Sequence, residues 1–203
     1  MGVRAVFLVG FMGSGKNTVG RELACRLGWD FVDLDAQIER RERQSIPEIF
    51  RVRGEPAFRL AETAALSDFL TNSLRRNSVV ALGGGAFAVE SNRALLRRCP
   101  TVFLDAPVDE LWRRCQRDGR ERPLRRNRDE FARLYGERLP FYREASLVIE
   151  THDHEPASIC AKIETALRLR EASEDALSNS GELPSRGSQD PVLQRSLKTG
   201  ETH

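Results

Sequence analysis

Short apolar runs alternate with amphipathic stretches along the first 170 residues of the chain. The runs are rich in Val, Ile, Phe and Leu, whereas the stretches between them repeat their apolar positions with helical spacing. Strands that are apolar throughout are typical of a parallel sheet covered on both faces. The pattern predicts strands at residues 5–9, 31–34, 79–82, 102–104 and 147–149.

The amphipathic stretches predict a helix between almost every pair of strands, which indicates an α/β sandwich. In such folds, ligands bind beyond the carboxyl ends of the strands. The expected helices are residues 18–27, 36–43, 47–53, 56–73, 91–98, 108–117, 128–143 and 156–169.

The pattern stops near residue 170, so we expect one domain over residues 1–170. Residues 171–203 contain six acids, three bases and no aromatic residue. Such a segment buries too little apolar area to offset its ordering entropy. We expect residues 171–203 to be a disordered polar tail.

Composition excludes several classes of protein. The net charge is +2, so we expect no nucleic-acid partner and no membrane surface. The chain has no apolar stretch near the ~20 residues of a membrane span and no signal-peptide pattern. Its four cysteines form no C-x-x-C pair, which favours reduced thiols in a cytoplasmic protein.

A phosphate-loop motif, Gly10-Phe-Met-Gly-Ser-Gly-Lys-Asn-Thr18, follows the first predicted strand. The backbone N–H groups of such a loop surround phosphate oxygens, and the helix that follows adds positive potential. We therefore expect Gly13, Ser14, Gly15 and Thr18 to bind ATP. Lys16 would reach the terminal phosphates and assist catalysis.

Asn17 stands where the motif normally has Ser or Thr, whose hydroxyl ligates Mg²⁺. An amide oxygen is also a hard neutral ligand for Mg²⁺. We expect Asn17 to form a working but weaker metal site.

Asp33 and Asp35 end the second predicted strand. On an extended segment, residues two apart point to the same side. One carboxylate would then lie near Mg²⁺, and the other would accept a hydrogen bond from a substrate hydroxyl. In the alternative interpretation, Asp35 caps the helix that begins at Ala36.

Gly83, Gly84 and Gly85 follow the third predicted strand. Three glycines permit unusual backbone dihedrals and leave the main chain open to a small polar substrate. The alternative is a tight turn into the next helix.

Arg59, at the start of a long predicted helix, has the planar donor geometry that captures a carboxylate, although it could also be a solvated surface residue.

Residues 113–143 hold eleven arginines against five acids. A basic loop near a nucleotide site predicts a mobile lid over the phosphates, at about residues 116–128. The alternatives are a solvated face or a nucleic-acid patch, and the scarcity of aromatic residues in the loop disfavours the second.

Taken together, these motifs resemble the shikimate kinase family over residues 3–170. The resemblance rests on the phosphate loop, Asp33-Leu-Asp35, Gly54-Glu-Pro-Ala-Phe-Arg59, the glycines 83–85, Arg122-Pro-Leu124 and Arg138-Leu-Pro-Phe-Tyr-Arg143. It implies a nucleoside-monophosphate-kinase-like phosphate-loop fold, a three-layer sandwich whose five parallel strands have the order 2-3-1-4-5. It also implies that the protein uses ATP and Mg²⁺ to phosphorylate the 3-hydroxyl of shikimate, a step toward chorismate and the aromatic amino acids. We expect a monomer.

The resemblance assigns a role to each candidate residue. Asp35 would hold the reacting hydroxyl and act as base, and Asp33 would support Mg²⁺ through water. The other assignments are Arg59 and Arg138 to the substrate carboxylate, Gly84 and Gly85 to the ring site, Arg122 to the phosphates from the lid, and Arg114 to adenine stacking.

Two departures from the family pattern leave other functions open. Asn17 is the first. The second lies after the last strand, where Thr151-His-Asp-His-Glu-Pro156 replaces an arginine before proline, so that His152 and His154 are expected as loop residues or modest adenine contacts. The alternatives are a gluconate-type small-molecule kinase and a weakly active nucleotide-binding regulatory protein.

Overall fold

A five-stranded parallel sheet forms the centre of the computed structural model, which describes residues 3–73, 76–117 and 127–169. The strand order is β2-β3-β1-β4-β5, as expected. The strands are β1 (Ala5–Val9), β2 (Asp30–Asp33), β3 (Ser78–Ala81), β4 (Thr101–Asp105) and β5 (Leu147–Glu150).

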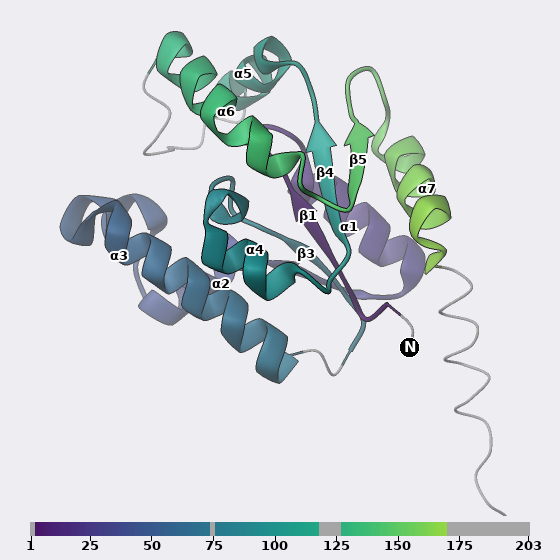
Figure 1. Cartoon of the computed structure of the whole chain (residues 1–203), viewed down its shortest axis with the longest axis horizontal. Helices are drawn as coiled ribbons and strands as arrows, with labels where there is room; N and C mark the ends of the chain where they lie inside the picture. The colour runs from purple at the N-terminus through teal and green to yellow at the C-terminus, as the bar shows by residue number, and fades with distance from the viewer. Residues whose placement is uncertain (1–2, 74–75, 118–126, 170–203) are drawn as a thin grey trace, which may run out of the picture.

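Strand β1 contributes to two hydrophobic cores because its side chains alternate across the sheet. Phe7 and Val9 belong to one cluster of buried residues, and Val6 and Leu8 to the other. Every residue of β1 is buried. The continuous apolar run therefore reflects a strand covered on both faces, which confirms the three-layer sandwich (Figure 1).

Two helices, α1 (Lys16–Leu27) and α7 (Pro156–Leu167), cover one face of the sheet. Their contact includes an ion pair in which Arg26 Nε lies 2.6 Å from Oε1 of the buried Glu164. Figure 1 shows α7 beside β5 and the other helices, α3, α4 and α6, on the opposite face.

The opposite face carries the elements that form most of the functional cavity. Its buried residues come mainly from helices that follow β2, β3 and β4. These are α2 (Leu34–Glu42), α3 (Ile46–Asp68), α4 (Glu90–Leu96), α5 (Val108–Arg117) and α6 (Arg128–Tyr142), with the short helical segments η1 (Phe69–Ser73) and η2 (Ala86–Ala88).

Helix α3 is bent at Gly54, which separates the two helices that the sequence predicted. Gly54 has φ 79° and ψ 169°, a region open almost only to glycine. Pro56 follows and cannot donate a helical hydrogen bond. The bend divides α3 into a first part that begins at the cap Ser45 and a second part that carries Arg59.

The expectation that Asp33-Leu-Asp35 is extended is wrong. Strand β2 ends at Asp33, and Leu34 already begins α2. Asp33, not Asp35, is the helix cap: its Oδ1 accepts a hydrogen bond from Ala36 N at 3.3 Å. The cap turns the chain immediately, so Asp35 lies in the first turn of α2.

Some expectations fall outside the described residues. These are the tail at 171–203, Arg122 and most of the predicted lid. Within the described part of the chain, no helix is long and apolar enough to cross a membrane. No disulfide joins the four cysteines, all of which lie in the described ranges.

Replacing Gly54 with Ala should lower the free energy of unfolding by roughly 1–3 kcal/mol, because alanine is strained at this φ and ψ. Urea denaturation of the full chain measures the change. Gly136→Ala is the control: Gly136 is inside α6, and a Cβ there would meet no atom within 4 Å. An equal stability for Gly54→Ala and wild type would contradict the strain argument.

Candidate active site

A cavity of about 690 Å³ lies at the carboxyl ends of the central strands. It is bounded by the phosphate loop, the start of α2, both parts of α3 and the three consecutive glycines. The residues that line it are Met12, Gly13, Gly15, Lys16, Asn17, Thr18, Asp33, Asp35, Ala36, Glu39, Ile46, Pro47, Phe50, Phe58, Arg59, Glu62, Leu82, Gly83, Gly84, Gly85, Arg114 and Arg138.

The phosphate loop wraps tightly between β1 and α1. Gly13 and Gly15 both have positive φ, 84° and 89°, and Gly15 is the residue that precedes α1. A Cβ on Gly13 would lie 2.7 Å from Leu111 O, so α5 also excludes a side chain there. The loop therefore presents backbone to the cavity.

Lys16 folds back onto its own loop. Its Nζ donates to Gly10 O at 2.8 Å and to Phe11 O at 3.0 Å. Ser14 is nearly fully buried and does not line the cavity, whereas its neighbours in the loop do. Only the backbone of Ser14 is therefore suited to contact a nucleotide.

Asn17 and Asp33 meet at the phosphate-loop side of the cavity. Asn17 Nδ2 donates to Asp33 Oδ2 at 2.6 Å, and the other oxygen of Asp33 caps α2. Both residues line the cavity beside Lys16 and Thr18. Their amide and carboxylate oxygens are hard donors, so this pair fits a Mg²⁺ ion shared with phosphate oxygens.

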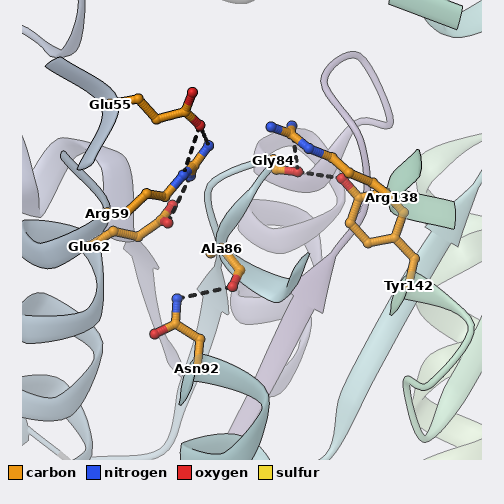
Figure 2. A network of polar contacts seen from close by, with 8 residues as sticks. All are labelled: Glu55, Arg59, Glu62, Gly84, Ala86, Asn92, Arg138 and Tyr142. Atoms are coloured by element: carbon orange, nitrogen blue, oxygen red, sulfur yellow. Dashed lines mark hydrogen bonds and ion pairs between the residues drawn. The ribbon is translucent and has the colours of Figure 1, made fainter. Parts of the chain in front are cut away.

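Arg59 is held between two glutamates on α3. Its Nη1 donates to Glu62 Oε2 at 2.8 Å, and its Nη2 donates to Glu55 Oε1 at 2.9 Å (Figure 2). Arg59 is only 18% exposed. The alternative interpretation of Arg59 as a solvated surface residue is therefore wrong.

Glu62 is a residue of the cavity that the sequence did not reveal. It is fully buried, lines the cavity and pairs with Arg59. Burial raises the pKa of Glu62 to about 7, although Arg59 lowers it; the nearby Asp35 raises it further. The spacing of three residues from Arg59 on a helix was the available signal, but surface ion pairs share that spacing.

Gly83 and Gly85 are required for space and not for unusual dihedrals, whereas a Cβ on Gly84 would come no closer than 3.4 Å to a neighbouring atom. None of them has positive φ, which corrects that part of the expectation. A Cβ on Gly83 would lie 2.6 Å from both Asp35 Oδ1 and Glu62 Oε1, and one on Gly85 would lie 2.5 Å from Arg59 Nη2. The charged side chains of Asp35, Glu62 and Arg59 therefore pack directly against the backbone of Gly83 and Gly85, and no Cβ separates them from it.

The carbonyl of Gly84 is held from helix α6. Arg138 Nη1 donates to Gly84 O at 3.3 Å, and the hydroxyl of Tyr142 donates to the same oxygen. Figure 2 shows Gly84 between the Arg59 cluster and the pair formed by Arg138 and Tyr142. The two arginines expected at the substrate thus reach the same glycine segment from different helices.

Arg114 marks the other end of the cavity. Its Nε donates to Glu110 Oε1 at 2.8 Å, and its Nη2 donates to Thr151 O at 3.3 Å. These bonds place Arg114 between α5 and the loop after β5. His152 and His154 belong to that loop but do not line the cavity; they lie near Asp153 and Lys162, respectively.

Comparison with known families identifies one matching family model, "Shikimate kinase", over residues 12–168. A shikimate kinase from Halorhodospira halophila is 47% identical over 168 residues, which cover 80% of this chain and 93% of that protein.

Solved structures give the same result. A shikimate kinase from Acinetobacter baumannii in complex with shikimate matches with a TM-score of 0.75 and 36% identity; the match covers 89% of this chain and 96% of that one. A gluconokinase from Sinorhizobium meliloti matches with a TM-score of 0.54 but only 17% identity, which shows a common fold alone.

The pKa of Glu62 predicts a pH dependence of stability. Its pKa is about 7 in the folded protein against an ordinary 4.5, so the folded protein holds the proton more tightly. The stability that this proton contributes is present below about pH 4.5 and is lost as pH rises to about 7. Wild type should lose about 3 kcal/mol relative to Glu62→Gln over this window.

Urea denaturation of both proteins at several pH values measures this difference. The groups that face Glu62 are Arg59, Asp35 and Arg138, and all three are retained in Glu62→Gln. A wild type that keeps or gains stability relative to Glu62→Gln as the pH rises through this window would contradict the raised pKa.

Proposed function

The chain belongs to the shikimate kinase family, and we propose that its cavity binds ATP on the phosphate loop and shikimate against the glycine wall, residues 83–85. As a member of this family it is an ATP-dependent kinase. It phosphorylates shikimate in the pathway of aromatic amino acid biosynthesis.

One observation carries the assignment of the two ends of the cavity. A single cavity joins a phosphate loop to a second cationic end, where Arg59 and Arg138 flank glycine backbone. Shikimate carries a carboxylate and ring hydroxyls, which match an end built from guanidinium groups, backbone and an acidic residue. Planar guanidinium groups bind carboxylates with two parallel hydrogen bonds.

At the nucleotide end, the loop from Gly13 to Thr18 would surround the phosphates. Lys16 would exchange its bonds to the carbonyls of Gly10 and Phe11 for phosphate oxygens. Arg114 would stack on the adenine. Arg122, which lies outside the described residues, would reach the transferred phosphoryl group and stabilise its charge.

Asn17 and Asp33 would hold Mg²⁺, which supplies charge neutralisation at the phosphates when bound. Asn17 would offer its amide oxygen, since its nitrogen already donates to Asp33. Asp33 would act mainly through water, because one of its oxygens caps α2 and the other accepts from Asn17.

Asp35 would orient the reacting hydroxyl and accept its proton. It lies in the first turn of α2, at the Gly83 end of the wall, with Glu62 beside it. Phosphoryl transfer requires mainly positioning and charge stabilisation. The fixed arginines at one end and the loop at the other provide that positioning.

The function is tested by ADP release from ATP and Mg²⁺ with shikimate and, separately, with gluconate. We expect turnover that depends on shikimate. Turnover with gluconate alone would support a gluconate-type kinase, which shares only the fold with this chain at 17% identity. ATP binding without turnover would support the regulatory alternative.

Replacing Arg59 with Lys should raise the KM for shikimate about tenfold or more, because a charge-assisted bidentate contact is lost. Lysine keeps the charge but cannot reach Glu55, Glu62 and a carboxylate at once. The KM for ATP should stay within about twofold. Arg51→Lys, on an exposed side chain of the same helix, is the matched control. An unchanged KM for shikimate would remove Arg59 from the acceptor site.

Replacing Asn17 with Thr should strengthen Mg²⁺ binding roughly tenfold, since a hydroxyl ligand restores the usual motif. Titration of Mn²⁺ into the protein with ADP, followed by electron paramagnetic resonance, measures the affinity without turnover. If both proteins bind Mn²⁺ equally, Asn17 is not a determinant of metal affinity.

A further inference from the structure

We propose that Tyr142 is a positioning residue for the acceptor: its hydroxyl fixes the Gly84–Gly85 peptide so that the N–H of Gly85 is directed at the carboxylate. This inference rests on the proposed binding of shikimate against the glycine wall. It concerns a residue that touches neither nucleotide nor acceptor in that arrangement.

Tyr142 is the last residue of α6 and is fully buried. Its ring stacks on Phe103 of β4, with a centroid separation of 5.2 Å and an interplanar angle of 30°. The ring is therefore held by the core, and its hydroxyl donates to Gly84 O (Figure 2). A rigid donor of this kind fixes the direction of the carbonyl it binds.

Fixing that carbonyl also fixes the next N–H group. The described chain has no cis peptide bond, so Gly84 C=O and Gly85 N–H lie in one peptide plane and point in opposite directions within it. The N–H of Gly85 therefore points away from Tyr142. Neither Gly84 N–H nor Gly85 N–H has a hydrogen-bond partner within the described part of the chain, and both glycines line the cavity.

The direction of this N–H matters because of its neighbours. The guanidinium of Arg59 lies against Gly85, and Arg138 binds Gly84 O on the α6 side. A carboxylate placed between the two arginines would meet the Gly85 N–H as a third donor. A backbone donor whose direction is fixed before the ligand binds adds affinity, because little conformational entropy is lost on binding.

Tyr142 also allows Arg138 to serve the substrate. Gly84 O accepts from both Arg138 and Tyr142. When Arg138 turns toward a carboxylate, Tyr142 still satisfies the buried carbonyl. Burial raises the pKa of the Tyr142 phenol above its usual range, so the hydroxyl remains a donor at neutral pH.

The other end of the wall is held independently. Asn92 Nδ2, on α4, donates to Ala86 O at 2.9 Å. Removing the Tyr142 hydroxyl should therefore reorient the Gly84–Gly85 peptide without releasing the whole segment. The ring of Phe at position 142 would keep its packing on Phe103.

The experiment compares wild type, Tyr142→Phe and Tyr135→Phe in steady-state kinetics. Tyr142→Phe should raise the KM for shikimate about three- to tenfold, the effect of one lost hydrogen bond, with kcat and the KM for ATP within about twofold. Tyr135 lies on the same helix as Tyr142, and its hydroxyl donates to Asp105 Oδ1 at the end of β4. Tyr135→Phe removes that hydroxyl and should leave the KM for shikimate unchanged. Equal effects of the two variants, or a loss confined to kcat, would overturn the proposal.

A second measurement does not depend on the variants. In wild-type protein labelled with ¹⁵N-glycine, the Gly85 amide signal should shift on titration with shikimate, and shift less with shikimate methyl ester, which lacks the charge. An unshifted Gly85 signal under saturating shikimate overturns the role of Tyr142. Wild-type turnover of shikimate is measured separately, so failure of the proposed function is distinguished from failure of this inference.

Discussion

The ion pair between Glu62 and Arg59 is the interaction on which the acceptor end of the cavity depends. A fully buried carboxylate is stable only beside a cation or with a bound proton. Glu62 is fully buried, and its pKa is raised to about 7, so near neutral pH it exists both as a carboxylate paired with Arg59 and as a protonated acid. The pair presses the guanidinium of Arg59 against Gly85, while Glu62 and Asp35 approach Gly83. Side chains at these glycines would displace the charged groups, so the glycine wall and the ion pair require each other.

The fold brings this charged end to the phosphate loop without long connections. Strand β1 ends at the loop and β3 ends just before the glycine wall, and the two strands are neighbours in the sheet. Parallel strands place their carboxyl ends at one edge, where helix starts also add positive potential. The bend at Gly54 then sets the second part of α3, with Arg59 and Glu62, over the same edge. The phosphate loop and the arginines Arg59 and Arg138 thus line one cavity.

The strands, the phosphate loop and the strand order could be predicted from the sequence, the first two from local patterns and the third from the family resemblance. The apolar runs indicated the strands because strands buried on both faces need them, and the spacing of Gly13, Gly15 and Lys16 identified the loop because its backbone geometry is local. The strand order followed from the family resemblance. Glu62 and Tyr142 were not identified, since the approach of Glu62 to Gly83 and the hydrogen bond from Tyr142 to Gly84 join residues distant in the chain. The purpose of the glycines was misjudged for the same reason: neighbouring charges, and not their own dihedrals, exclude a Cβ.

The most direct test of this account is a crystal structure of the protein with shikimate and ADP. The account predicts the shikimate carboxylate between Arg59 and Arg138, with Gly85 N–H as a further donor and the reacting hydroxyl facing Asp35. The β-phosphate of ADP would lie in the loop that begins at Gly10, with Lys16 released from the loop carbonyls. A carboxylate bound away from both arginines, or shikimate placed with its hydroxyls against the glycine wall and its carboxylate toward Lys16, would contradict it.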